Sequence, residues 1–223
     1  MIPLWIKIAY TLFVAVLVPV YWVRFGALHF LWASDIALLA MVIALWRESR
    51  LITSTVAVAT LLPELGWNLD FFARLLAGRD MFGLDATAYM FNPAQPLWLR
   101  GLSLFHVFLP ALLVYMLWRL GYDRRARLAA TLLCWVVLPV TYLFTDPEQN
   151  INWVFGLGGE PQTWMPAPLY LLGLMLLFPL CVYLPTHLAL QKVFARRRKR
   201  KPAQDTSGTR LATCPSRSRH DPT

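Results

Sequence analysis

The sequence predicts an all-α polytopic membrane protein: a six-transmembrane-helix bundle with cytoplasmic N- and C-termini and a basic, disordered C-terminal tail. Of its 223 residues, 58% are hydrophobic and only 15% are charged, and the mean hydropathy is +0.51. A soluble domain of this length carries more charged residues. Six apolar runs, most of them long enough to cross a bilayer, recur along the chain. They cover residues 3–23, 27–46, 51–65, 99–120, 128–145 and 167–190.

The six runs differ in strength. The third run is the weakest, because it is short and ends at Pro63 and Glu64. The first run lacks a basic leader and a small-residue cleavage site, so we expect it to remain as a span rather than to be removed as a signal peptide. We expect residues 1–191 to form one transmembrane domain and residues 192–223 to form the tail.

Positive charge predicts the orientation of the bundle. The chain has 21 Lys and Arg and 12 Asp and Glu, of which 10 basic and 2 acidic residues lie from Lys192 onward. Because basic residues mark cytoplasmic loops, residues 47–50, 119–127 and the tail are expected on the cytoplasmic side. Residues 66–98 and 146–166 are then the long outer loops. Residues 65–83 mix aromatic and charged residues at a helical period, which is typical of an amphipathic helix at the membrane interface.

Polar residues gather toward the outer end of these predicted spans. His29 lies at the outer end of the second run, and Ser34 and Asp35 follow roughly 10 Å further in at 1.5 Å per residue. His106 lies at a similar depth in the fourth run. Glu64, Asn150 and Asn152 lie at the outer ends of the third and fifth runs. Ionisable groups inside a membrane are costly and usually mark a functional site or a structural partner.

A hydroxyl, an imidazole and a carboxylate are the parts of a nucleophile, a base and an orienting group. Ser34 is the candidate nucleophile and His106 the candidate base, with Asp35 or His29 fixing the imidazole. The amides of Asn150 and Asn152 are candidate donors to an oxyanion. In a membrane, the natural substrate of such a site is an acyl ester.

A different interpretation fits the same residues. Ser and His side chains on separate membrane helices can simply hydrogen-bond across the bundle. The protein would then be a non-enzymatic membrane protein, such as a small-molecule carrier, a receptor or an assembly factor. A carrier is expected to show internal repeats or broken helices in matching halves, and the sequence has no such repeat. Glu64 would then be only a hydrated helix end.

Four stretches carry a resemblance to a known family. In order they are LHFLWASDIALLAMVIALW, LSLFHVFLPALLVYML, NINWVFG and APLYLLGLMLLFPLCVYLP. This order over residues 27–190 resembles the YwaF-like family of bacterial six-span membrane proteins. More remotely it resembles the androgen-induced membrane hydrolases of fatty-acid esters of hydroxy fatty acids, and a membrane acyltransferase that acts on phospholipids.

The resemblance implies roles for particular residues. The family carries a Thr or Cys nucleophile in an early span and a His in a later one, and these positions match Ser34 and His106. Ser replaces Cys or Thr here, and one extra residue separates His29 from Ser34, so Asp35 remains an alternative for the functional position. The NINW stretch resembles the family's Asn-x-Asn-aromatic stretch, which implies that Asn150 and Asn152 line the site.

The sequence also predicts the partners. We expect membrane lipid around the bundle, an acyl lipid as the substrate, and anionic lipid at the basic tail. Nucleic-acid binding is not expected, because a basic cluster beside a span already has a topological explanation. The three scattered cysteines form neither a disulfide framework nor a zinc-binding pattern, so we expect no metal and no cofactor. The expected location is the inner membrane.

Overall fold

All regular secondary structure in the described part of the chain is helical. The structure is a computed structural model that describes residues 1–199. Its elements are α1 (Leu4–Phe25), η1 (Ala27–Leu31), α2 (Ala33–Arg47), α3 (Arg50–Ala77), η2 (Ala88–Phe91), α4 (Leu97–Leu102), α5 (Phe105–Leu120), α6 (Ala126–Phe144), η3 (Ile151–Trp153), α7 (Ala167–Leu177), the π-helix η4 (Phe178–Tyr183) and α8 (Leu184–Lys199). The predicted all-α fold is confirmed.

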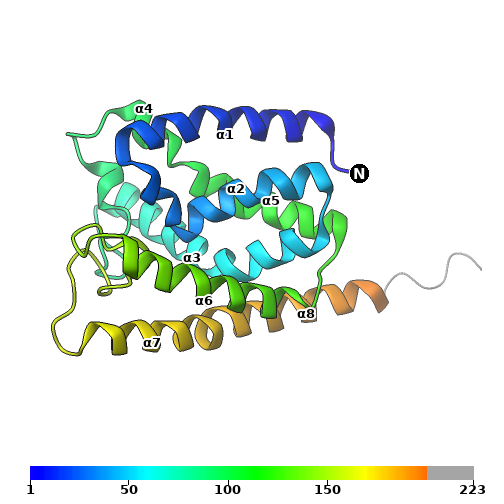
Figure 1. The fold of residues 1–223 in the computed structure, drawn as a ribbon. Helices are drawn as coiled ribbons and strands as arrows, with labels where there is room; N and C mark the ends of the chain where they lie inside the picture. The colour runs from blue at the N-terminus through cyan, green and yellow to red at the C-terminus, as the bar shows by residue number, and fades with distance from the viewer. Residues whose placement is uncertain (200–223) are drawn as a thin grey trace, which may run out of the picture.

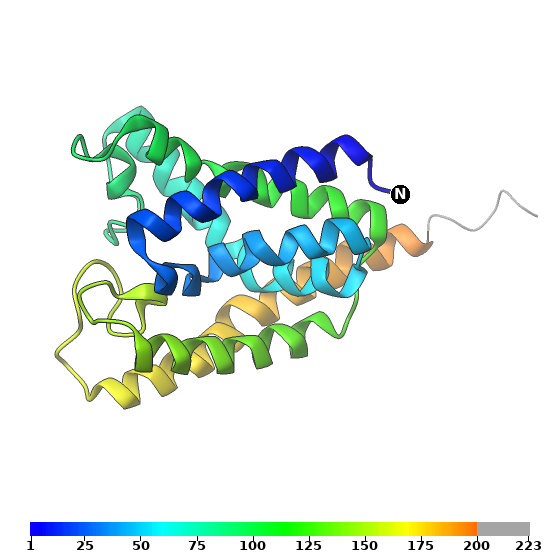
Figure 2. The same ribbon diagram turned by 45° about the horizontal axis from the view of Figure 1, so that its top comes forward.

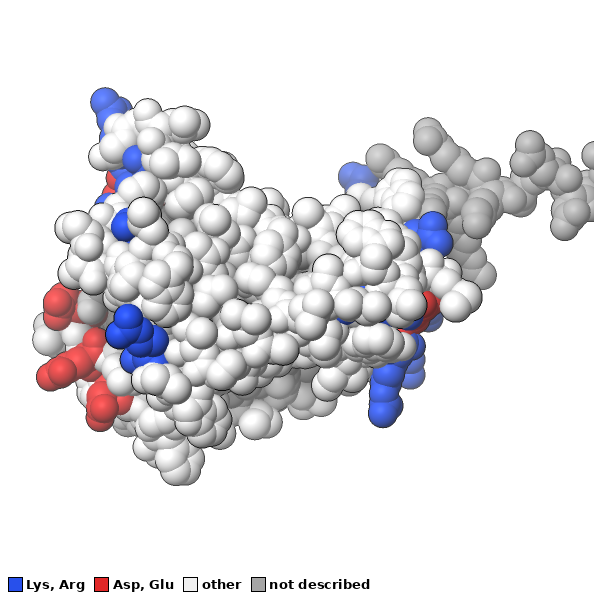
Figure 3. All heavy atoms as spheres, turned by 90° about the horizontal axis from the view of Figure 1, so that it is seen from above, with Lys and Arg blue, Asp and Glu red and all other residues white. Residues whose placement is uncertain are grey.

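Four helices are long and apolar enough to cross a membrane. They are Leu4–Phe25, Leu97–Leu120, Ala126–Phe144 and Ala167–Ala195. Each matches one of the six predicted runs. In the space-filling view, Lys, Arg, Asp and Glu lie at the two ends of the molecule, and the belt between them is free of charge on the visible face (Figure 3). The protein therefore has the surface of a membrane protein.

The other two predicted runs have a different form. The second run begins as the short helix η1 and continues as α2, which has only 15 residues. The third run, predicted to be short and to end at Glu64, is part of α3, which has 28 residues. The helix passes through Pro63 and continues to Ala77. Most of the predicted interfacial helix, and the first part of the predicted outer loop, therefore belong to α3 instead. Its position explains this continuation, because packing in the centre of the bundle overrides the local effect of proline.

α3 divides the bundle into two sides (Figure 1). On one side it packs against α2 and α5, with α1 beyond them, and on the other side it packs against α6 and η4. The N-terminus and the end of α8 lie at one end of the bundle. The long connections between α3 and α4 and between α6 and α7 lie at the opposite end (Figure 2).

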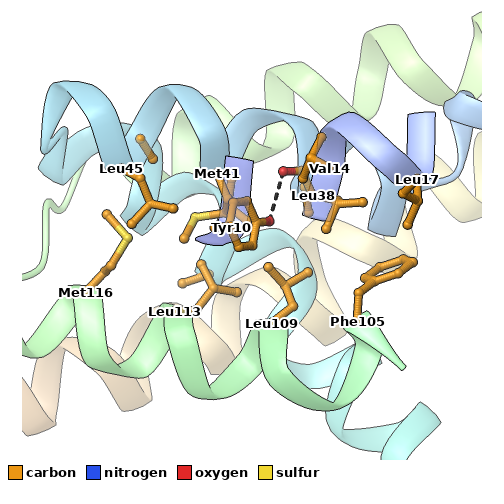
Figure 4. Packing of buried hydrophobic residues seen from close by; sticks show 14 of the residues in the cluster. Tyr10, Val14, Leu17, Leu38, Met41, Leu45, Phe105, Leu109, Leu113 and Met116 are labelled. Atoms are coloured by element: carbon orange, nitrogen blue, oxygen red, sulfur yellow. Dashed lines mark hydrogen bonds between the residues drawn. The ribbon is translucent and has the colours of Figure 1, made fainter. Parts of the chain in front are cut away.

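The side formed by α1, α2 and α5 is tightly packed. Large side chains from three helices interlock there, and Leu38, Met41 and Leu113 have no exposed surface (Figure 4). The Tyr10 hydroxyl donates a hydrogen bond of 2.9 Å to the backbone carbonyl of Leu38. This bond satisfies a buried phenol and joins α1 to α2.

The last helix extends beyond its predicted end. α7, η4 and α8 form one continuous helical segment from Ala167 to Lys199, with a π-helical stretch at Phe178–Tyr183. Residues 192–199 are therefore helical, whereas the sequence predicted that the disordered tail begins at residue 192. The remaining part of the predicted disordered tail, residues 200–223, lies outside the described residues.

Candidate functional site

A cavity of about 760 Å³ lies between α2, α3, α6 and α7 and is lined at one end by the connections between α3 and α4 and between α6 and α7. It is much larger than the space left by a single missing side chain, and it is large enough for a small-molecule ligand. All seven candidate residues from the sequence line it. They are His29, Ser34, Asp35, Glu64, His106, Asn150 and Asn152.

His106 and Glu64 form the best-defined polar pair of the cavity. Nδ1 of His106 lies 2.8 Å from Oε2 of Glu64, and the Glu64 side chain is 3% exposed. The Nδ1–H group therefore donates to the carboxylate, which leaves Nε2 as the nitrogen that can accept a proton. Glu64 is a buried residue in the middle of α3, so its interpretation as a hydrated helix end is wrong.

Neighbouring side chains fix the plane of the imidazole. The His106 ring stacks on the indole of Trp67 with centroids 4.5 Å apart, and on the ring of Phe105 at 4.1 Å. Nδ2 of Asn68 donates to the backbone carbonyl of His106 at 2.7 Å and to that of Glu64 at 2.8 Å. Together these contacts hold the start of α5 against the middle of α3.

Sequence reasoning missed Trp67 and Asn68, although a signal was present. Glu64, Trp67 and Asn68 have the spacing i, i+3, i+4, which places them on one face of a helix. The prediction that the third span ends at Glu64 separated them. A helix continued through Pro63 and Gly66 would have identified this face.

Ser34 lines the same cavity but is not bonded to the histidine. It is the second residue of α2, it is half-buried, and its hydroxyl makes no hydrogen bond within residues 1–199. The expected hydrogen bond between Ser34 and His106 is therefore not formed in this structure. The serine hydroxyl remains free to bond to a ligand in the cavity.

Asp35 and His29 form a second, looser pair. Nε2 of His29 lies 3.7 Å from Oδ2 of Asp35, which is too long for a hydrogen bond. The other oxygen of Asp35, Oδ1, is buried without a hydrogen-bond partner. The His29 ring stacks on Phe25 with centroids 4.5 Å apart. The predicted role of orienting His106 therefore belongs to Glu64 and not to Asp35 or His29.

Asn152 holds the start of α2. Its Oδ1 accepts a hydrogen bond of 2.8 Å from the backbone N–H of Ala33, and its Nδ2 donates to the carbonyl of Leu31 at 2.7 Å. The first N–H groups of a helix need such acceptors, and the residue before α2, Trp32, supplies no side-chain cap. Asn152 thus caps α2 from a distant loop and fixes the backbone beside Ser34.

Asn150 organises a loop that lines the cavity. Its Nδ2 donates to the carbonyls of Gly156 and Gly158, at 2.8 and 3.0 Å, and its Oδ1 accepts from the N–H of Phe155. Both Asn150 and Asn152 have positive φ angles, 41° and 55°, a conformation that asparagine tolerates better than most residues. These contacts give both amides a structural role and leave their predicted role as oxyanion donors without support.

Away from this polar end, most residues of the cavity wall are apolar. Five residues of α6 that line it recur at helical spacing, so they form one stripe: Ala130, Leu133, Cys134, Val137 and Leu138. Across the cavity, Leu174, Leu177 and Phe178 belong to α7 and to the start of the π-helix. The cavity thus has polar side chains at one end and mostly apolar side chains along the rest of its wall. Within residues 1–199 no three His, Cys, Asp or Glu side chains are arranged to hold a metal ion.

Comparison with known proteins finds no relative from which a function could be transferred. No family model, no curated protein and no solved structure matches this chain. The candidate function therefore depends on the chemistry of the cavity.

Proposed function

We propose that the protein is a lipid-directed hydrolase or acyltransferase that works inside the membrane. The observation that carries this proposal is the His106–Glu64 pair, which borders the same cavity as the free hydroxyl of Ser34. A carboxylate bonded to Nδ1 stabilises the imidazolium that forms when Nε2 takes a proton. The apolar section of the cavity suits the acyl chain of the substrate.

The reaction would proceed in two steps. The Ser34 hydroxyl attacks the acyl carbonyl of an ester while His106 takes its proton, and the leaving alcohol receives that proton as the ester bond breaks. Water then cleaves the acyl-serine in a hydrolase, and a second alcohol accepts the acyl group in an acyltransferase. Because Ser34 and His106 are not hydrogen-bonded here, substrate binding has to bring the two groups together, as is common in ligand-free sites.

A reactive-serine probe tests this assignment. Purified protein in detergent is treated with a fluorophosphonate, and the modified residue is located by mass spectrometry. We expect labelling at Ser34, with a loss of about 10²–10⁴-fold in labelling rate for His106→Ala and a smaller loss for Glu64→Gln. Ser103→Ala is the matched control, since Ser103 also lines the cavity but bonds to Tyr21.

Two outcomes would change the proposal. If Ser34→Ala keeps ester hydrolysis that His106→Ala removes, the His106–Glu64 pair activates water directly and Ser34 only lines the cavity. If no variant changes any labelling or hydrolysis, the polar cluster packs the helices or binds a ligand. The protein would then be a carrier, a receptor or an assembly factor.

We also propose that the bundle crosses the inner membrane six times, with both termini in the cytoplasm. The distribution of Lys and Arg among the loops supports this orientation. So does the position of the N-terminus and the end of α8 at the same end of the bundle (Figure 1). The order of the four sequence stretches supports membership of the YwaF-like family. Reporter fusions after Pro161 and at the C-terminus should report opposite sides of the membrane, and the same side for both would contradict six spans.

A further inference from the structure

The walls of the cavity include two helices that do not close against each other. α2 and α6 both pack along α3, but they make no extensive contact with one another. Between them, Ala37 and Ala40 of α2 face the cavity from one side, and Val137 of α6 faces it from the other. Val56 and Thr60 of α3 form the floor. The result is a groove along α3 that has α2 and α6 as its walls.

One edge of α6 borders both this groove and the outside. Leu133 lines the cavity and yet is 38% exposed, whereas Ala130 and Cys134 on the same stripe are buried. Trp135 lies about 200° further around the helix, and its indole Nε1 donates to the carbonyl of Met175 in α7. The Leu133 edge therefore points away from α7, toward the groove beside α2.

The groove is lined mainly by apolar side chains and has polar side chains at one end. No charged side chain lines it between Ala37 and Ala40 on α2 or between Ala130 and Leu138 on α6, within the described residues. Ser34 stands one turn before Ala37 on α2, at the polar end of the groove. A ligand that fits has an apolar chain and a polar group near one end.

We propose that a membrane lipid enters the cavity sideways from the bilayer, through the groove between α2 and α6. Its acyl chain lies against Leu133 and Ala40, and its polar end reaches Ser34. The assignment of an ester to that polar end rests on the proposed function. The lateral route does not, because it depends only on the groove.

Photocrosslinking in liposomes tests the route. The full-length protein is reconstituted with a phosphatidylcholine that carries a diazirine near the end of one acyl chain, and the adducts are mapped by mass spectrometry. We expect adducts on Val137 and Thr60, which face the cavity, in addition to adducts on the outward-facing Val136. The ratio of Val137 to Val136 adducts measures access to the cavity.

Two neighbouring leucines provide a matched pair of variants. Leu133→Trp narrows the groove and should remove most of the Val137 adducts while those on Val136 remain. Leu132→Trp adds the same bulk to an exposed position that does not line the cavity, and it should leave the ratio unchanged. Ala40→Trp narrows the opposite wall as a second test, with Ile43→Trp as its control.

The outcomes separate this inference from the catalytic one. Adducts confined to outward-facing residues, or a ratio that both leucine variants change equally, would overturn the lateral route. A second outcome is also informative: Leu133→Trp loses the Val137 adducts, but Ser34 of the wild type is not labelled by the fluorophosphonate. This outcome would support the lateral route and reject the serine hydrolase.

Discussion

The two sides of α3 differ in how completely they are filled. On the side of α1, α2 and α5, residues such as Leu45, Leu109 and Met116 are large and fully buried (Figure 4). On the side of α6 and α7, the buried residues of α6 that face α3 include Ala126, Ala130 and Cys134. These small side chains leave the space that becomes the cavity.

The two sides of α3 have different roles: one carries the candidate residues, and the other contains most of the cavity. The catalytic candidates stand on helices of the packed side, with Glu64 on α3, His106 on α5 and Ser34 on α2. Close packing fixes the positions of the helices that carry these residues. The hollow side supplies the space for a ligand. A closely packed half that carries the candidate residues therefore lies beside a half that contains most of the open space.

Truncation of a leucine on each side should reveal this difference most strongly. Leu113→Ala creates a new hole among fully buried side chains, so we expect it to lower the free energy of unfolding by about 2–5 kcal/mol. Leu138→Ala enlarges a cavity that already exists, and we expect a loss of about 1 kcal/mol, because only the contacts of the removed atoms are lost. Reversible unfolding in detergent measures both. Equal losses would mean that the two sides are equally well packed.

The next largest loss of stability is expected from the hydrogen bonds that join the 150–158 loop to the start of α2. Asn152→Ala removes the hydrogen bonds to Ala33 and Leu31 and places alanine at a positive φ, so we expect a loss of about 1–3 kcal/mol. Thermal unfolding in detergent measures this loss. Asn92→Ala is the control, since Asn92 bonds only within its own exposed loop. An unchanged melting temperature for Asn152→Ala would show that α2 needs no cap from the 150–158 loop.

The sequence predicted the helical class and the location of the polar cluster well, because both depend on patterns within single segments. Four of its apolar runs are helices long enough to cross a membrane. Its estimate of depth at 1.5 Å per residue brought seven residues to one cavity.

The sequence did not predict which polar residues form hydrogen bonds with one another. Pro63 and Glu64 resembled the end of a span, whereas α3, packed against α2, α5, α6 and η4, stays helical to Ala77. The pairing of His106 with Glu64, rather than with Ser34 or Asp35, follows from the rotation of α3 against α5. That rotation depends on side-chain packing between helices, which no single segment contains. The roles of Asn150 and Asn152 likewise depend on a loop folding back onto α2.

Acid should lower the stability of the connection from α5 to α6, with a smaller effect than the changes above. Asp123, in the connection from α5 to α6, accepts a hydrogen bond from the backbone and side chain of Arg125, and Arg125 lowers its pKa from 3.8 to about 2. A carboxylate with a lowered pKa contributes stability above its unfolded value, and that contribution is lost as the pH falls toward the folded value. We expect the melting temperature to decline between about pH 4 and pH 2 less steeply in Asp123→Asn than in the wild type. Glu160→Gln, at an exposed position in the connection between α6 and α7, is the control. Parallel curves for Asp123→Asn and wild type would contradict this role.

The most direct test of the account is to locate a lipid chain in the bundle. A crystal grown from a lipidic mesophase doped with a phospholipid brominated at the end of one acyl chain would give an anomalous signal at each bromine position. The account predicts a peak inside the cavity, beside Cys134 and Leu138, with the chain leading toward Ser34. Peaks only on the outer surface of the bundle, with the cavity closed or empty of lipid, would contradict it.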